Sequence, residues 1–233
     1  MKKIICSALV LVMMLALVAC PVPQDIFAKS EGVMSWEEYN AAELGAEVVV
    51  EAFIQGKQAW WAKDGVGRGT FYLQDNVGGY LAYELLCTEE EYNQLAVGTK
   101  VRLTGYKDMW SGEVEIIDCH FIALESEPYV AEAKDLTDKL GTDELVKYQN
   151  QLVTFTGLTV EEISYKAEGD DIYVKLSYNG ATYSFCVEKY LTGPDTDLYK
   201  AVGQLKKGDV VDVTGFLYWY EGPNTHITAV TVK

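Results

Sequence analysis

Apolar and polar side chains alternate at every second residue along much of this chain, a period that predicts β-strands rather than helices. Segment 70–74, Thr-Phe-Tyr-Leu-Gln, shows the alternation clearly, and the Gly78-Gly79 pair predicts a turn before the next strand. In the first half of the chain we expect five strands, at residues 47–54, 70–74, 80–86, 100–105 and 113–124.

Two short helices interrupt the strand pattern of the first half, and each begins with a capping box. In this motif a Ser or Thr side chain and a Glu three residues later cap the first turn of a helix. Ser35 and Glu38 predict a helix that begins at Trp36, and Thr88 and Glu91 predict a second one. The second helix falls between the third and fourth strands.

The second half of the chain repeats this order of elements. Strands are expected at residues 151–157, 171–178, 181–187, 207–215 and 225–232, with a helical stretch between 188 and 205. Segment 207–215 matches segment 97–105 in its glycines and its apolar alternation. The acidic residues 127–148, between the two halves, are expected to form a helical linker with a break at Gly141.

Both halves contain the pattern Gly-x-x-Val-x-[Leu/Val]-Thr-Gly, at residues 98–105 and 208–215. This pattern resembles the fourth strand of the OB-fold, a five-stranded Greek-key barrel with a helix between its third and fourth strands. The part from Tyr148 onward is also similar to small exported OB modules of the tRNA-anti-like kind, a name that records a fold relationship. Residues 34–125 are similar to exported OB-fold lipoproteins of bacteria through Trp36-Glu37-Glu38-Tyr39, Gln58-Ala59-Trp60-Trp61 and Trp110-Ser111-Gly112-Glu113-Val114-Glu115-Ile116.

We therefore expect an all-β fold with short helices, built from two tandem five-stranded OB-like Greek-key barrels. The first barrel should span residues 33–126 and the second 149–233, with residues 127–148 between them. Because unrelated functions occur on this fold, the resemblance implies the architecture and leaves the activity open.

The first 20 residues have the form of a bacterial export signal. Two lysines precede an apolar run at residues 4–18, which is too short to span a bilayer comfortably. Leu17-Val18-Ala19-Cys20 resembles the lipobox of bacterial lipoproteins, which implies cleavage after residue 19 and a lipid on Cys20. Residues 20–32 would then form a polar, irregular tether. The alternative is an ordinary signal peptide with an incidental cysteine.

The charge of the chain limits the choice of partners. Removal of residues 1–19 takes away two lysines and no acidic residue, so 17 basic and 35 acidic residues remain and the net charge is −18. Nucleic-acid binders need a basic surface that displaces phosphate counterions, and this chain has only two arginines, Arg68 and Arg102. We therefore expect no nucleic-acid partner. The acidity could equally serve only to keep an exported protein soluble.

Three cysteines follow Cys20, at positions 87, 119 and 186, and no spacing among them suggests a metal site. Cys87 and Cys119 could form a disulfide after export. Alternatively, each thiol is a small core residue, because each cysteine lies in an apolar strand pattern.

Aromatic residues mark the candidate binding site, because OB barrels bind ligands on strands 2 and 3 and on the loops beside them. The alternation places Phe71 and Leu73 in the core and Tyr72 outside. By the same alternation we expect Leu81 and Tyr83 to point inward and Tyr80 outward. Together with the loop residues, the predicted aromatic platform consists of Trp60, Trp61, Tyr72, Tyr80 and Trp110. These rings could instead cap the barrel ends, where a small domain gains buried area.

The second half repeats this arrangement more loosely. Tyr173 corresponds to Tyr72, and Tyr218-Trp219-Tyr220 occupies the loop after the fourth strand. At most two of these three loop rings can contact a ligand, and one or more should pack on the linker or on the first barrel.

Catalysis finds little support in the sequence. The histidines, His120 and His226, have no neighbouring nucleophile, and no hydrolase, metalloprotease or phosphate-loop motif occurs. Glu113 and Glu115 share one face of a strand and are interpreted as a solvated edge. We expect no enzyme activity, no cofactor and no metal.

Together these observations predict a lipid-anchored binding or adaptor module on the extracytoplasmic face of the cell membrane. Its ligand would be a glycan, a peptide or a protein partner. Two alternatives remain open: single-stranded nucleic-acid binding at the cell surface, which the OB resemblance favours, and a purely structural spacer in the cell envelope.

Overall fold

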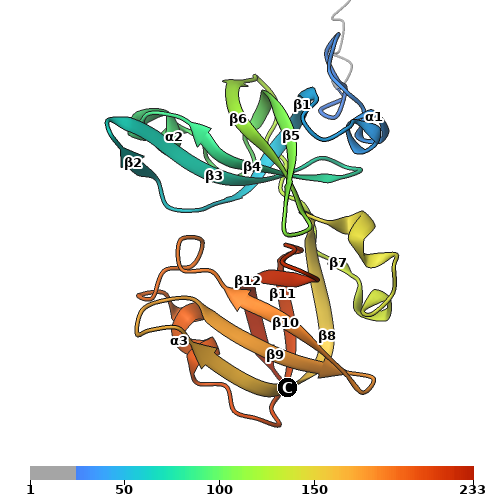
Figure 1. Ribbon diagram of the computed structural model, residues 1–233, viewed down its shortest axis with the longest axis vertical. Helices are drawn as coiled ribbons and strands as arrows, with labels where there is room; N and C mark the ends of the chain where they lie inside the picture. Colours follow the sequence, from blue (N-terminus) through green and yellow to red (C-terminus); the bar gives the residue numbers. More distant parts are fainter. Residues whose placement is uncertain (1–24) are drawn as a thin grey trace, which may run out of the picture.

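A computed structural model describes residues 25–233, which form two β-barrels, one above the other in Figure 1. Each barrel contains one six-stranded sheet and carries short helices. No helix within the described residues is both long and apolar enough to cross a membrane. The predicted export signal and the lipid site at Cys20 lie outside the described residues.

The first barrel closes a sheet of order β1-β5-β6-β4-β3-β2 through an additional β1–β3 pairing. Strand β4 runs parallel to β6, while the other paired strands are antiparallel. Its elements are α1 (Trp36–Ala41), β1 (Glu47–Lys57), β2 (Trp61–Lys63), β3 (Val66–Gln74), β4 (Gly79–Leu86), α2 (Glu89–Gln94), β5 (Lys100–Trp110) and β6 (Glu113–Ala123).

The second barrel has the equivalent order, β11-β12-β10-β9-β8-β7, and closes through a β11–β8 pairing. Strands β10 and β12 are again parallel. Its elements are β7 (Lys134–Asp135), the 3₁₀ turns η1 (Thr137–Lys139) and η2 (Leu145–Tyr148), β8 (Leu152–Tyr165), β9 (Ile172–Tyr178), β10 (Ala181–Val187), α3 (Asp197–Gly203), β11 (Val210–Phe216) and β12 (Asn224–Val232).

Both barrels therefore have OB topology, which confirms the expected fold class. In each, the first strand pairs with the fourth, and a short helix, α2 or α3, lies between the third and fourth strands. The extra strands β2 and β7 are short additions at the sheet edge. Both expected capping boxes are present, because the Ser35 and Thr88 side chains accept from Glu38 N–H and Glu91 N–H.

Segment 127–148 differs from the expected helical linker. It contains β7 and the two 3₁₀ turns, and β7 pairs with β8 of the second barrel. Leu136, Leu140 and Leu145 are buried in the core of the second barrel. Acidic residues alternate here with leucines, and burial of those leucines fixes the segment onto the barrel as part of its core.

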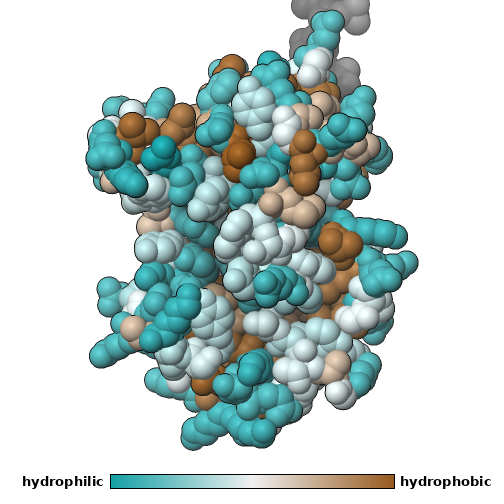
Figure 2. All heavy atoms as spheres, viewed as in Figure 1, coloured by the Kyte–Doolittle hydropathy of each residue, from teal (hydrophilic) through white to brown (hydrophobic). Residues whose placement is uncertain are grey.

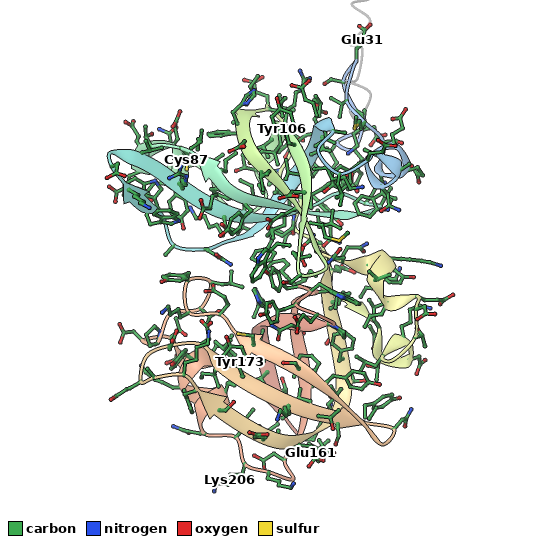
Figure 3. The ribbon with its side chains drawn as sticks, viewed as in Figure 1. Glu31, Cys87, Tyr106, Glu161, Tyr173 and Lys206 are labelled. Carbon is green, nitrogen blue, oxygen red and sulfur yellow. The ribbon has the colours of Figure 1, made fainter. Side chains whose placement is uncertain are left out.

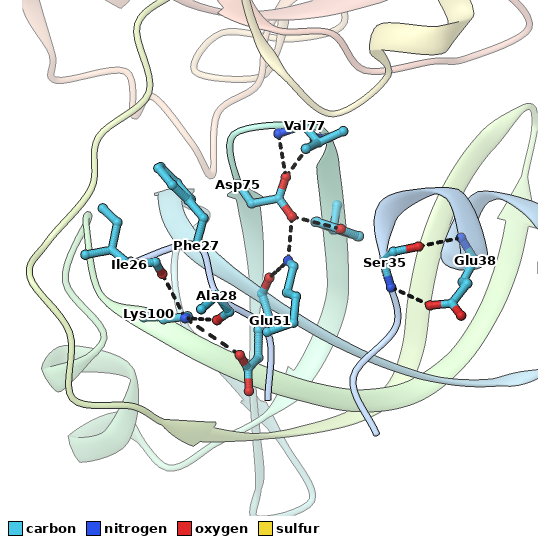
Figure 4. A network of polar contacts seen from close by, with 12 residues as sticks. Ile26, Phe27, Ala28, Ser35, Glu38, Glu51, Asp75, Val77 and Lys100 are labelled. Carbon is cyan, nitrogen blue, oxygen red and sulfur yellow. Dashed lines mark hydrogen bonds and ion pairs between the residues drawn. The ribbon is translucent and has the colours of Figure 1, made fainter. Parts of the chain in front are cut away.

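The polar segment ahead of the first barrel is irregular from residue 25 onward, as expected, but it is held against that barrel (Figure 4). Lys29 Nζ donates to the nearly inaccessible carboxylate of Asp75 at 2.6 Å. Lys100 Nζ donates to the carbonyls of Ile26 and Ala28 at 2.8 and 3.0 Å. The described part of this segment is therefore bound to the barrel as far as Ile26.

Of the two alternatives for the three cysteines, the structure shows buried thiols rather than a disulfide between Cys87 and Cys119. Cys87, Cys119 and Cys186 are all free and buried. Burial raises the pKa of Cys87 to about 11 and that of Cys119 to about 12, so both stay protonated thiols at neutral pH.

Candidate functional site

The outer face of β3 and β4, which is the ligand face of an OB barrel, meets the second barrel. The Tyr72 ring stacks on Phe216 with centroids 4.3 Å apart and planes at 8°. Leu81 completes this buried cluster. Two glycines permit the close approach, since a Cβ on Gly56 would meet the Phe216 ring and one on Gly79 would meet the Asn150 backbone.

The tip of the β5–β6 hairpin forms the second contact between the barrels. Its turn residues Ser111 and Gly112 have positive φ angles of 51° and 93°. Ser111 O accepts from Glu221 N–H at 2.8 Å, and Gly112 O accepts from Gln149 Nε2 at 2.8 Å. Hydrogen bonds therefore fix the hairpin both to the loop between β11 and β12 and to the segment just before β8.

Beside these contacts the two barrels leave an open groove. One cavity of about 580 Å³ contains residues from both barrels. A second cavity of about 440 Å³ adjoins it, because Gln58 and Tyr83 line both. On the face shown in Figure 2, pale side chains of intermediate hydropathy gather where the barrels meet. The rings that line the two cavities are Trp61, Tyr83, Trp110, Tyr173, Tyr190, Tyr218 and Tyr220.

The groove is acidic, because Glu115 and Glu188 line it and Lys166 is the single Lys or Arg among its described lining residues. Burial is the main cause that raises the pKa of Glu115 to about 7, helped by the charges of Asp108 and Glu84. Burial likewise raises the pKa of Glu188 to about 7. Both side chains can therefore donate or accept a hydrogen bond near neutral pH.

His226 lies at the floor of the larger cavity and is held by two tyrosines. Its Nδ1 lies 2.5 Å from the Tyr72 hydroxyl, and its ring stacks on Tyr218 with centroids 4.1 Å apart. Burial lowers the pKa of His226 to about 3, so the imidazole is neutral at physiological pH.

Two members of the predicted aromatic platform, Trp61 and Trp110, are exposed in the groove, one in each cavity. Trp110 packs on Tyr220 of the second barrel, with ring centroids 5.2 Å apart. Trp60 is half-buried and donates its indole N–H to the Cys87 carbonyl at 3.1 Å. Tyr72 leaves the core of the first barrel as expected, but the second barrel covers it completely.

The expected orientation of the third strand was wrong. Tyr80 pairs with Leu73 and Ala82 with Phe71, so all four side chains share the core face of the first barrel. Tyr80 is fully buried there and cannot contact a ligand in the groove. The opposite face of β4 carries Leu81, in the contact between the barrels, and exposed Tyr83, in the groove.

The interpretation of Glu113 and Glu115 as a solvated edge was also wrong. Glu113 is fully buried and accepts from Trp219 N–H at 2.7 Å, while Glu115 lines the groove and is 5% exposed. The two share a face of β6, as expected, but the second barrel covers that face.

The second barrel supplies site residues that the sequence only partly indicated. Tyr173, which the repeat pairs with Tyr72, lies on β9 and lines the groove, whereas Tyr106 lies at the far end of the first barrel (Figure 3). In the Tyr218-Trp219-Tyr220 loop, the outer two rings line the groove and Trp219 packs against Gly112 of the first barrel. Glu188 and His226 had no sequence signal as site residues. Within residues 25–233 no cluster of His, Cys, Asp or Glu side chains could hold a metal ion.

No protein-family model matches the sequence, and no curated protein is significantly similar to it. A murine DNA-binding protein bound to double-stranded DNA matches with a TM-score of 0.39 and 9% identity, over 79% of this chain and 94% of that chain. The Ifi202 HINa domain in complex with double-stranded DNA gives 0.38 and 11%, over 81% and 98%. A replication protein A heterotrimer bound to single-stranded DNA gives 0.34 and 11%, over 80% and 49%. With scores this low, the OB assignment rests on the strand order.

Proposed function

We propose that this chain is a non-catalytic binding module that holds its ligand in the groove between its two barrels. The observation that supports this most directly is the pair of adjoining cavities at the OB ligand face, with Trp61 in one and Trp110 in the other. The larger cavity, at about 580 Å³, falls within the ~300–1,000 Å³ of typical small-ligand sites. Aromatic rings give a ligand large contact areas at low cost in side-chain entropy.

The proposed location is the extracytoplasmic face of the cell membrane, through a lipid on Cys20. The lipobox-like sequence supports this part, and the groove does not depend on it. Mass spectrometry of the N-terminal peptide should find a diacylglycerol-modified cysteine, and Cys20→Ser should move the protein from the membrane to the soluble fraction. An unmodified Cys20 in the mature protein would refute the anchor and leave the binding proposal intact.

The charge of the groove opposes a nucleic-acid ligand. Binding to phosphates depends on Lys or Arg, and Lys166 shares the larger cavity with Glu115, Asp171 and Glu188. The similar structures bind DNA, but their TM-scores carry no function to this chain. Salt-sensitive binding of single-stranded DNA would replace our proposal with the nucleic-acid alternative.

The test is a titration of the full-length chain, in a detergent without a sugar headgroup, against neutral oligosaccharides, peptides and single-stranded DNA. Trp110→Ala and Tyr83→Ala should each weaken binding about tenfold, because one stacked ring contributes about 1–2 kcal/mol. Tyr106→Ala is the matched control, since Tyr106 is 45% exposed and Tyr83 is 41% exposed, but Tyr106 lies outside both cavities. Absence of binding, or equal effects of all three variants, would refute the proposal and favour a structural spacer.

A further inference from the structure

A chain of hydrogen bonds runs from the first barrel to His226 of the second. Tyr92 O–H donates to the Gln58 carbonyl at 2.8 Å and thereby fixes the Gln58 backbone. Gln58 Nε2 donates to the Tyr72 hydroxyl oxygen at 3.3 Å. The Tyr72 hydroxyl lies 2.5 Å from His226 Nδ1. The Tyr92 contact positions the Gln58 backbone, and the Gln58 side chain and the Tyr72 hydroxyl form the relay to His226.

This chain determines which nitrogen of His226 carries the proton. The Tyr72 oxygen accepts from Gln58, and among residues 25–233 His226 Nδ1 is the one acceptor within hydrogen-bond distance of the buried Tyr72 hydroxyl, so the Tyr72 hydrogen is assigned to Nδ1. The neutral imidazole then holds its single proton on Nε2. Nε2 has no hydrogen-bond partner among residues 25–233, and His226 lines the larger cavity while being only 5% exposed. An almost fully buried side chain therefore presents an unpartnered N–H to the groove.

The remaining lining residues narrow the class of ligand. Among the described residues that line the two cavities Ala59 is the only aliphatic one, so the apolar side chains of a peptide would find little aliphatic surface to pack on. The acidic residues that line the cavities outnumber the one lysine, Lys166, and this charge disfavours an anionic ligand. Flat rings interspersed with carboxyl, amide and imidazole groups suit a ligand with apolar ring faces and many hydroxyls. The two adjoining cavities suit a chain of several rings rather than one.

We propose that the groove binds a linear, uncharged oligosaccharide and that His226 Nε2–H donates a hydrogen bond to a sugar oxygen, held in that role by the Gln58–Tyr72 relay. This inference rests on the proposed function and names its ligand. Because sugar hydroxyls both donate and accept, carboxyl groups such as Glu115 complement the imidazole donor. Tyr72 and Gln58 are positioning residues, since neither has to touch the ligand to set the role of His226.

The relay can be tested without a ligand. The chain has only two histidines, so a His120→Gln variant assigns the imidazole ¹⁵N resonances of His226. We expect a protonated Nε2 and an unprotonated Nδ1 in the native protein. In Tyr72→Phe, which keeps the ring stacked on Phe216, the fixed tautomer should give way to a mixture. A protonated Nδ1 in the native protein, or the same tautomer in Tyr72→Phe, would overturn the relay.

Ligand binding gives the second test, by titration of the full-length chain with cello-, chito- and malto-oligosaccharides of increasing length. Affinity should rise with length and then level off. His226→Asn keeps a polar group beside Tyr72 but withdraws the donor from the groove, and it should weaken binding about fivefold, the value of one neutral hydrogen bond. His226→Gln, whose Nε2 reaches the position of the imidazole Nε2, should retain most of the affinity.

The outcomes separate this inference from the proposed function. If peptides or oligogalacturonate bind in a manner that depends on Trp110 and neutral oligosaccharides do not, the oligosaccharide inference fails and the binding module stands. Equal affinity of His226→Asn and the native protein for an oligosaccharide would overturn the role of His226. If nothing binds in a manner that depends on Trp110, both fail.

Discussion

Glu113 joins the two barrels, and we expect it to be protonated in the folded protein. Its Oε2 accepts from Trp219 N–H at 2.7 Å and from Gln149 Nε2 at 3.0 Å. Its Oε1 and the Oδ1 of neighbouring Asn150 are both buried without a partner. A proton on Oε1 would let Glu113 donate to Asn150 Oδ1 and so satisfy both atoms. Burial, the dominant cause, raises the pKa of Glu113 well above its ordinary value.

If Glu113 is protonated, two substitutions at this position should differ clearly in their effect on stability. Glu113→Gln copies the protonated carboxyl, with its oxygen for Trp219 and its Nε2 for Asn150. At about pH 4, near the ordinary pKa of a carboxyl group, the free energy of unfolding should therefore change by less than about 1 kcal/mol. Glu113→Ala removes the acceptor of Trp219 N–H and leaves a cavity, which should cost about 2–4 kcal/mol. Urea unfolding followed by tryptophan fluorescence measures both. The exposed Glu43→Gln is the control, and it should behave as the native protein does.

The dependence on pH isolates the proton itself. The folded pKa lies above the unfolded value, so this contribution to stability is complete below the ordinary carboxyl range and is lost as pH rises toward the folded pKa. One such proton corresponds to about 1.4 kcal/mol per pH unit. Glu115 and Glu188, both with a pKa of about 7, act in the same direction but are present in both proteins. The native protein should therefore lose stability relative to Glu113→Gln between pH 5 and 7.

Two results would refute this reasoning about Glu113. One is a stability difference between the native protein and Glu113→Gln that stays constant over that pH range, since it would mean that Glu113 exchanges no proton on folding. The other is a Glu113→Gln variant as unstable as Glu113→Ala, since it would mean that the carboxylate form makes the contacts.

Two further substitutions test contacts outside the groove. A Cβ on Gly79 would lie 2.4 Å from the backbone of the second barrel, so Gly79→Ala should lower the free energy of unfolding in urea by about 2–4 kcal/mol. Gly193→Ala is the control and should be nearly neutral, because a Cβ there would meet no atom closer than 3.9 Å. Lys29→Met leaves the Asp75 carboxylate, which is 2% exposed, without its cation, and should cost about 1–3 kcal/mol in thermal unfolding. The exposed ion pair between Lys139 and Glu144 is the comparison. Lys139→Met should lower the free energy of unfolding by less than about 1 kcal/mol.

Much of the fold could be predicted because local signals agree with it. The capping boxes at Ser35 and Thr88 form as expected, and the repeated Gly-x-x-Val pattern lies on β5 and β11, the fourth strand of each barrel. The side chains of β4 could not be oriented from sequence, because Tyr80, Leu81, Ala82 and Tyr83 are all apolar or aromatic. When one face of a strand enters the core and the other is covered by a second domain, both faces are apolar, and alternation does not show which of them is the core face.

The same physical cause explains why the candidate site was only partly predictable. Alternation shows which side chains leave the barrel, as for Tyr72 on β3 and Glu113 on β6, but it carries no information on what covers them afterwards. Here the second barrel covers part of the OB ligand face, because Phe216 stacks on Tyr72. The groove is what remains open beside that contact. Its residues run from Gln58 to His226, so its floor and its hydrogen-bond donor exist only in the folded pair of barrels.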